Sequence, residues 1–343
     1  MKTISLIWRS FLVCTLSVGA SAAFAIQPMP KEAGFNGFIN VGGAYLDVKS
    51  NMIAGNSLGD IDNKEIDSIY ETPDSDSTLL PLLNFEFAYT FGETRTQIYV
   101  GNSFEDFLRF DAVNSVGVRQ EMADSSIVSA SFIFTTLPAE VWEDPYMANQ
   151  SRKKTDRSAQ GVRFIWGNIL DTNLDVKYTW KNIELDDEWS GTFGGLELNP
   201  AQIALLDREG NFHQVEFLYR WNFGDRHHLI PSLEYKKFDL DGDAMANDQY
   251  GIQLSYGYSG DKFSLVANGM YSYADYDTTN PIYNKSREDD IYGGSLTGFW
   301  HRPFGLPKGW SLTAAILGYK SDANIDFYTA DVVGTTLSVL YKF

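Results

Sequence analysis

The chain has 343 residues, with 27 basic and 45 acidic side chains and a formal net charge of −18. Its one cysteine, Cys14, excludes an internal disulfide and any metal site built from cysteines. After residue 25, no stretch approaches the roughly 18 consecutive apolar residues of a transmembrane helix. If the chain crosses a membrane, only a closed β-barrel remains, because backbone groups in lipid must be hydrogen-bonded internally.

Residues 1–25 have the features of a secretory signal peptide. Lys2 and Arg9 give a positively charged start, Ser10 to Ala20 form an apolar segment, and Ala23-Phe24-Ala25 is a small-residue cleavage motif. We therefore expect export through the inner membrane and cleavage after Ala25.

The remaining sequence, 26–343, reads as a single domain in which apolar and polar residues alternate in segments of strand length. Such alternation predicts strands with one face in lipid, and the many aromatic residues suit the belts at the two membrane surfaces. The clearest segments are 83–91, 128–134, 162–166, 174–180, 215–223, 250–258 and 337–343.

Short, turn-like connections between these segments alternate with long ones. The long connections fall near 49–78, 139–157, 186–211, 239–248, 275–290 and 321–331, with a compact outer one near 103–109. This pattern predicts one antiparallel transmembrane β-barrel of about fourteen strands, within a range of roughly 12–16. An even number of strands returns the chain to the side where it began, so we expect periplasmic termini, short periplasmic turns and long acidic extracellular loops.

The last strand carries a pattern of its own. Leu337, Val339, Tyr341 and Phe343 share one face, and the chain ends on an aromatic residue. This pattern resembles the C-terminal signal that the barrel-assembly machinery reads in bacterial outer-membrane barrels, so we expect that machinery to be a partner during insertion.

One long connection contains a short helix signal. Asn199 can cap a helix, Pro200 suits its first position, and Gly210 can end it. Two interpretations remain open: a surface turn that covers the rim, or a constriction folded into the lumen.

The face opposite the aromatic residues predicts where charge lies inside the barrel. It carries six basic residues that we take as candidate site residues: Arg119, Arg163, Lys177, Lys181, Arg220 and Lys236. Asp175, Glu216 and Glu234 lie among them. The residues therefore form either a self-neutralising network or a basic wall that attracts anionic solutes.

The acidic loops also allow two interpretations, a solvated surface or a binding surface for cations among lipopolysaccharide phosphates. Asp239, Asp241 and Asp243 have the spacing of a calcium loop, but Ala244 and Tyr250 stand where that loop needs glycine and glutamate, which excludes an EF-hand. The basic cluster around Arg152 either docks a lipopolysaccharide phosphate or pairs with neighbouring acidic residues.

No catalytic motif stands out. Serine does not occur in a G-x-S-x-G setting, and histidine does not occur at metal-binding spacing. Only His213 falls near the outer rim, and it lies on the same strand face as the lipid-facing Val215. We therefore expect no enzymatic activity, no cofactor and no metal.

Three stretches resemble an uncharacterised family of Gram-negative secreted proteins, known as domain of unknown function 2860. They are Ile26 to Asn40, Lys49 to Asn56 and Asp74 to Phe91. The resemblance implies no activity and transfers no functional residue.

We expect a Gram-negative outer-membrane barrel that acts as a passive, porin-like channel for small hydrophilic solutes. Its surroundings would be outer-membrane lipid and lipopolysaccharide, and we expect no nucleic-acid partner. The alternative is a non-conducting surface protein whose acidic loops bind cations, envelope polysaccharide or a partner. A transporter of hydrophobic substrates would need an apolar lumen and an N-terminal plug, which the polar inner face argues against.

Overall fold

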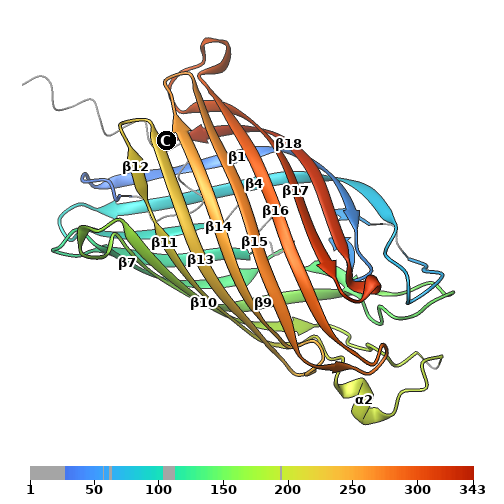
Figure 1. Cartoon of the computed structure of the whole chain (residues 1–343). Helices are drawn as coiled ribbons and strands as arrows, with labels where there is room; N and C mark the ends of the chain where they lie inside the picture. The colour runs from blue at the N-terminus through green and yellow to red at the C-terminus, as the bar shows by residue number, and fades with distance from the viewer. Residues whose placement is uncertain (1–27, 57, 62–63, 103–112, 194) are drawn as a thin grey trace, which may run out of the picture.

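The computed structural model describes residues 28–343 except 57, 62–63, 103–112 and 194. The predicted signal peptide and most of the predicted connection at 103–109 lie outside the described residues. Within the described part, the chain forms one sheet that closes on itself through pairing of the first strand with the last (Figure 1).

Fourteen antiparallel strands make up the wall of this barrel in the described part of the chain, as the alternation predicted. In chain order they are β1 (Gly34–Lys49), β4 (Ser75–Phe91), β5 (Thr96–Asn102), β6 (Val113–Glu121), β7 (Ile127–Thr135), β9 (Lys154–Gly167), β10 (Leu174–Leu185), β11 (Gly210–Tyr219), β13 (His227–Leu240), β14 (Asn247–Ser259), β15 (Phe263–Asn280), β16 (Lys285–His301), β17 (Trp310–Ala323) and β18 (Ala330–Lys342).

Smaller elements complete or interrupt this wall. Strand β12 (Trp221–Phe223) continues β11 against β13 in the same register. Strands β2 (Ile53–Asn56), β3 (Gly59–Asp60) and β8 (Ala139–Trp142) belong to outer loops. The helical elements are α2 (Pro200–Ala204), η1 (Ile169–Asp171), η2 (Pro303–Gly305) and η3 (Asp326–Tyr328). None of the described helices is long and apolar enough to cross a membrane.

The two ends of the barrel differ. The C-terminus and the short turns lie at one end, which we call the inner end, and α2 lies with the long loops at the other, the outer end (Figure 1). The loops are named here by number: loop 1 (50–74), loop 3 (136–153), loop 4 (186–209), loop 5 (241–246), loop 6 (281–284) and loop 7 (324–329).

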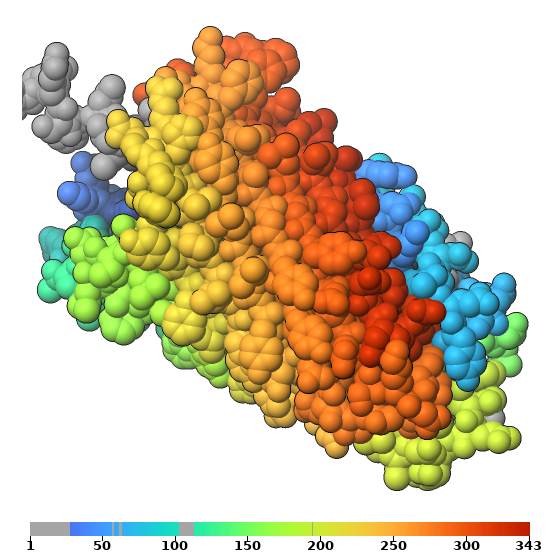
Figure 2. All heavy atoms as spheres, in the orientation of Figure 1, coloured from blue at the N-terminus to red at the C-terminus, as the bar shows by residue number. Residues whose placement is uncertain are grey.

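The predicted lipid-facing residues point outward. Phe132, Phe164, Phe217 and Ile252 are about half exposed, while their strand neighbours on the other face are largely buried. The outer surface of β13–β18 forms the front of Figure 2. A closed wall of this kind satisfies the backbone hydrogen bonds within the sheet, as lipid demands.

Aromatic residues gather near both ends of the outward face. Towards the outer end, Tyr235 packs against Tyr250 across the strand pair, with ring centroids 5.3 Å apart. Towards the inner end, Trp310 and Tyr341 form the corresponding pair at 4.7 Å. These two belts mark the membrane surfaces of an outer-membrane barrel.

Candidate functional site: the lumen and its outer cap

The inward face of the wall has two unlike halves. From β4 to β13 it carries charged and amide side chains, several of them paired across strands. From β14 to β18 most inward positions are small or hydroxyl-bearing, such as Ser255, Ser272, Ser311 and Thr336. Short side chains leave room inside the wall, and Tyr319, which has inward parity, is 37% exposed.

The candidate basic residues lie on the charged half, and three of them make close ion pairs. The guanidinium of Arg119 contacts Glu86 at 2.7 Å, the ammonium of Lys177 contacts Glu216 at 2.6 Å, and that of Lys236 contacts Glu234 at 2.6 Å. All six side chains are largely shielded from water, so removal of one partner would leave the other charge buried and uncompensated.

The other three candidates make different contacts. Arg220 lies 4.0 Å from Asp175, and Arg163 donates a hydrogen bond from its Nε to the Thr179 hydroxyl at 3.1 Å. The Lys181 ammonium lies 4.7 Å from the centroid of the Phe212 ring. The geometry thus favours the interpretation as a braced network over a uniform basic wall, with six cations set against Glu86, Asp175, Glu216 and Glu234.

A glycine lets one of these carboxylates lie flat along the wall. A Cβ on Gly251 would stand 2.6 Å from Glu234 Oε1, so only glycine leaves space for that side chain. Glu234 crosses β14 at this point and accepts a hydrogen bond from the Ser272 hydroxyl on β15 at 3.1 Å. The charged half is therefore tied to the hydroxyl half along the wall.

Loop 1 folds into the lumen at the outer end. A Cβ on Gly59 would lie 2.3 Å from the inward side chain of Leu80, so β3 rests on the inner face of β4. Ile61 is buried among Leu46, Leu80 and Val332, which line that part of the wall.

Loops 1 and 3 are joined by a short strand pair. Strand β2 pairs with β8, and β8 in turn pairs with the outer part of β9. Lys154 binds Glu140 at 2.9 Å and also forms a salt bridge with Asp60, which lowers the pKa of that carboxyl below its usual value. The ribbon of β3, β2 and β8 therefore runs from the inner face of β4 to the outer part of β9.

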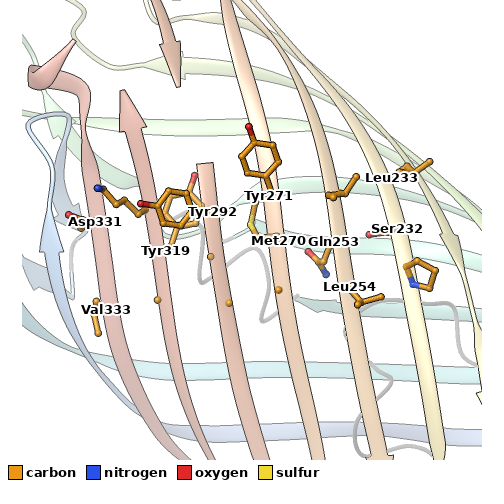
Figure 3. A pocket seen from close by; sticks show the side chains of 17 residues that line it. Ser232, Leu233, Gln253, Leu254, Met270, Tyr271, Tyr292, Tyr319, Asp331 and Val333 are labelled. Carbon is orange, nitrogen blue, oxygen red and sulfur yellow. The ribbon is translucent and has the colours of Figure 1, made fainter. Parts of the chain in front are cut away.

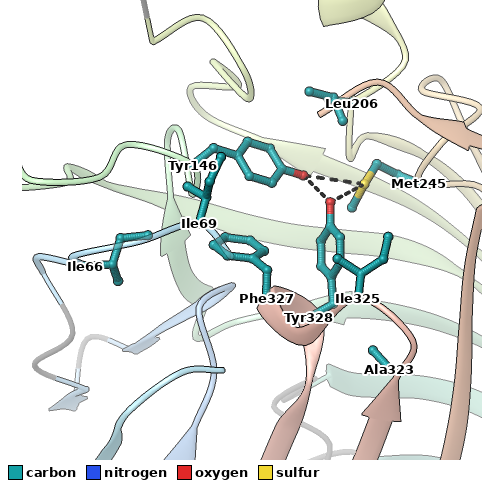
Figure 4. Packing of buried hydrophobic residues seen from close by; sticks show 9 residues of the cluster. All are labelled: Ile66, Ile69, Tyr146, Leu206, Met245, Ala323, Ile325, Phe327 and Tyr328. Atoms are coloured by element: carbon teal, nitrogen blue, oxygen red, sulfur yellow. Dashed lines mark hydrogen bonds between the residues drawn. The ribbon is translucent and has the colours of Figure 1, made fainter. Parts of the chain in front are cut away.

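Six outer loops meet in one apolar cluster, which we call the cap (Figure 4). Its fully buried members are Tyr146 of loop 3, Leu206 of loop 4 and Phe327 of loop 7. The other buried members are Ile66, Ile69, Met245, Ala323, Ile325 and Tyr328, and Ile282 and Tyr283 of loop 6 pack against them.

The predicted helix is part of this arrangement. Asn199 caps α2 with a complete capping box, since its side chain accepts hydrogen bonds from the backbone and Gln202 bonds back. The helix itself is largely exposed, and the residues that follow it carry Leu206 into the cap. The interpretation as a surface turn over the rim fits this geometry better than a separate constriction does.

At the inner end, the residues before β1 reach into the opening. Met29 is buried against Ile127 and Ile165, which face inward from β7 and β9. Arg95 holds this segment by donating a hydrogen bond to the carbonyl of Met29 at 3.3 Å. A short segment therefore covers part of the inner opening.

The lipid face carries a shallow groove over β13–β18, with a volume of about 970 Å³. Its lining includes Gly269, Gly294 and Gly318 together with Leu233 and Tyr271, the last two of which are labelled in Figure 3. Most of the residues that line it face outward, and Gln253 and Tyr319, which face inward, also line it.

The remaining sequence candidates lie apart from the charged network. The Arg152 guanidinium packs 4.3 Å from the Trp142 ring and donates to the carbonyl oxygens of Asn51 and Pro145, so it braces loop 3 from within. Burial lowers the pKa of Arg152 to about 10. His213 faces outward and lies 2.9 Å from the Tyr178 hydroxyl.

His301 joins three strands near the inner end. It lies between the hydroxyls of Ser264 and Ser311, at 2.7 and 2.9 Å. Both serines are buried, so this contact serves to link β15, β16 and β17.

Sequence reasoning missed the cap. Its residues are scattered over six loops, and no periodic pattern links them. The signal that was available is the number of large apolar residues, such as Ile66, Ile69 and Phe327, within otherwise acidic loops.

Comparison with known proteins gave two kinds of match. Solved structures with a similar fold include an outer membrane channel from Pseudomonas putida F1 (9% identity, TM-score 0.44, covering 93% of this chain and 100% of that one). Others are the outer membrane channel DcaP of Acinetobacter baumannii (11%, 0.42, 93% and 100%) and an anion-selective porin from Comamonas acidovorans (11%, 0.40, 91% and 100%). No curated protein matches the sequence.

The second match is to a family model, which covers residues 34–342. It spans the whole barrel and agrees with the resemblance noted in the N-terminal stretches. The chain therefore belongs to the family described as "Protein of unknown function (DUF2860)".

Proposed function

We propose that this protein is an outer-membrane channel for small hydrophilic solutes. The observation that carries the proposal is the polar inward face of a closed fourteen-stranded wall, half of which bears small hydroxyl side chains. Barrels of about eight strands fill their interior with side chains, whereas those of 16–18 strands leave an aqueous path. The serines and glycines of β14–β18 favour a water-filled interior at this intermediate size.

Solutes would cross the lumen along the charged network. Arg163, Lys177 and Lys181 lie on adjacent strands, with Arg119, Arg220 and Lys236 on either side. Paired charges of both signs would favour zwitterionic and uncharged polar solutes over ions of a single sign.

The second candidate is a non-conducting surface protein, and the cap favours it. An apolar layer built from six loops also suits a fixed outer surface that binds polysaccharide, cations or a partner. The two candidates differ in whether ions ever cross the barrel.

Single-channel recording of the refolded protein in planar bilayers separates the two. Steady, ohmic current steps from the unmodified protein support the channel. Steps that appear only after loop 7 is shortened support it as well. Absence of steps in both proteins, with folding verified by heat-dependent gel mobility, would leave the surface role.

We also propose how the protein reaches the membrane. Cleavage after Ala25 would release the barrel domain into the periplasm, and the face formed by Leu337, Val339, Tyr341 and Phe343 would then be read by the barrel-assembly machinery. Mass spectrometry of the mature protein tests the cleavage. Loss of surface-exposed protein on deletion of Phe343 tests the signal.

A further inference from the structure

The cap contains a contact that spans the outer mouth. Loop 3 connects β7 with β9, and loop 7 connects β17 with β18. Around the ring, six wall strands separate β9 from β17 on one side, and four separate β18 from β7 on the other. The two loops therefore start on nearly opposite sides, yet the hydroxyls of Tyr146 and Tyr328 lie 2.6 Å apart (Figure 4).

Tyr328 is held from several directions at once. Besides Tyr146, its hydroxyl accepts a hydrogen bond from the Asn280 amide of the β15–β16 hairpin at 2.8 Å. The Arg287 guanidinium lies 4.1 Å from the centroid of the Tyr328 ring and 4.4 Å from that of Tyr276, so it is in contact with both rings.

Arg287 is itself fixed by its own strand. Asp289 accepts hydrogen bonds from the Arg287 guanidinium, and the Ser321 hydroxyl of β17 donates to the same carboxylate at 3.2 Å. Asp289 is buried, so the ion pair is shielded from water and needs both partners. Tyr328 is thus held by wall residues on one side and by Tyr146 of loop 3 on the other.

Loop 7 is attached to the near wall by a separate set of bonds. Asn324 exchanges hydrogen bonds with the backbone of Ser286 and Glu288 on β16. Loop 7 contacts loop 3 across the mouth through the side chains of Phe327 and Tyr328, while the Phe327 carbonyl accepts a hydrogen bond from the Asn51 amide of loop 1 at 3.1 Å. Separation of these two side chains from loop 3 would leave the base of loop 7 in place.

We infer that Tyr328 is the latch of a gate at the outer mouth, and that the lumen opens to the outside when Tyr328 parts from Tyr146. The inference rests on the proposed channel function. The buried side chains of Leu206 and Phe327 belong to an apolar layer that joins loops from opposite sides of the outer mouth, so solutes would enter from outside where these loops separate.

A single cysteine placed in the lumen tests the gate without relying on ion flow. Gln253 faces inward from β14 and is partly exposed, and the chain has no cysteine outside the predicted signal peptide. We would express Gln253→Cys in intact cells and measure its labelling by a membrane-impermeant maleimide added outside. Tyr328→Ala in this background is expected to speed labelling at least tenfold, and Tyr328→Phe by a smaller factor.

Tyr45→Phe is the matched control. The Tyr45 hydroxyl donates to Ser77 at 3.0 Å on the outward face, so its loss leaves the mouth untouched. Heat-dependent gel mobility verifies that each barrel is folded. Equal labelling rates in the parent and Tyr328→Ala would overturn the latch, and so would fast labelling of the parent.

Conductance of the same variants separates this inference from the function on which it rests. If Tyr328→Ala is labelled quickly but carries no current in planar bilayers, the gate stands and the channel function fails. If the parent conducts steadily and Tyr328→Ala conducts no more, the channel stands and the latch is wrong.

Discussion

Along the wall of this barrel, neighbouring strands hold each other through long, regular ladders of backbone hydrogen bonds, whereas in the cap six loops hold each other through apolar side chains and isolated backbone hydrogen bonds, such as that from Asn149 to Ile66 at 2.7 Å. The β1–β18 pair alone runs without a break from Phe38 opposite Lys342 to Lys49 opposite Asp331. The cap depends on apolar packing around Phe327 and on bonds such as that between Tyr146 and Tyr328. Because the wall and the cap are held by different interactions, they open with different free energies. The cap can therefore loosen while the wall stays intact.

The largest effect is expected from a substitution that prevents the wall from closing and therefore disrupts the cap as well. A Cβ on Gly161 would stand 1.9 Å from the backbone oxygen of Trp180 on the paired strand. Gly161→Val should therefore prevent closure of the barrel and abolish heat-modifiable protein in membranes. Gly318→Ala is the control, since nothing lies within 4 Å of the added methyl group. Normal assembly of Gly161→Val would refute the close approach of β9 and β10.

The next effect should be confined to the cap. Phe327 is fully buried, and truncation of a buried phenylalanine to alanine costs about 3–5 kcal/mol. Phe327→Ala should make the outer loops sensitive to limited proteolysis while the wall stays folded. Phe304→Ala, at an exposed ring near the inner end, should leave the digestion pattern unchanged. Loss of the folded wall in Phe327→Ala would show that the two regions are not separable.

A smaller effect concerns the charges on the wall. Replacing Arg163, Lys177 and Lys181 with glutamate should shift reversal potentials in planar bilayers towards cation preference, by a few-fold in permeability ratio. Arg226→Glu in an exposed inner turn is the control, because Arg226 pairs with Asp261 at 3.4 Å outside the network. An unchanged reversal potential would mean that the network only braces the wall.

The smallest effect is a pH dependence of the link between loops 1 and 3. Lys154 lowers the pKa of Asp60, first through a hydrogen bond and then through its charge. A lowered pKa stabilises the folded link above the ordinary aspartate value of about 3.9, and this contribution is lost as the pH falls through the lower folded value. The protection factors of the amides in β2 and β3, that is, their exchange relative to unfolded amides, should thus be constant from pH 5 to pH 8 and fall below about pH 4. Asp60→Asn should show lower protection factors across the range from pH 5 to pH 8.

The sequence predicted the wall far better than it predicted the cap, for a physical reason. Lipid on one side and polar contents on the other impose a period of two, so Phe132, Phe164 and Phe217 could be assigned to the outward face and Arg119 or Lys177 to the inward one. The partners of the inward charges were harder to predict, because Glu86 on β4 and Arg119 on β6 meet across β5 and the strand register decides that contact. No such constraint acts on the loops, where the contact of Tyr146 with Tyr328 joins residues 182 positions apart.

Ring closure also has a consequence for biogenesis. The terminal residue is part of the seam, since Phe343 and Gly37 exchange backbone hydrogen bonds at 3.1 and 3.2 Å. Until the ribosome has released the whole chain, β1 has no partner on one of its sides, and an unpaired edge invites pairing with other chains. A chain truncated before β18 should therefore fail to close its sheet and expose two strand edges, so we expect it to aggregate or be degraded.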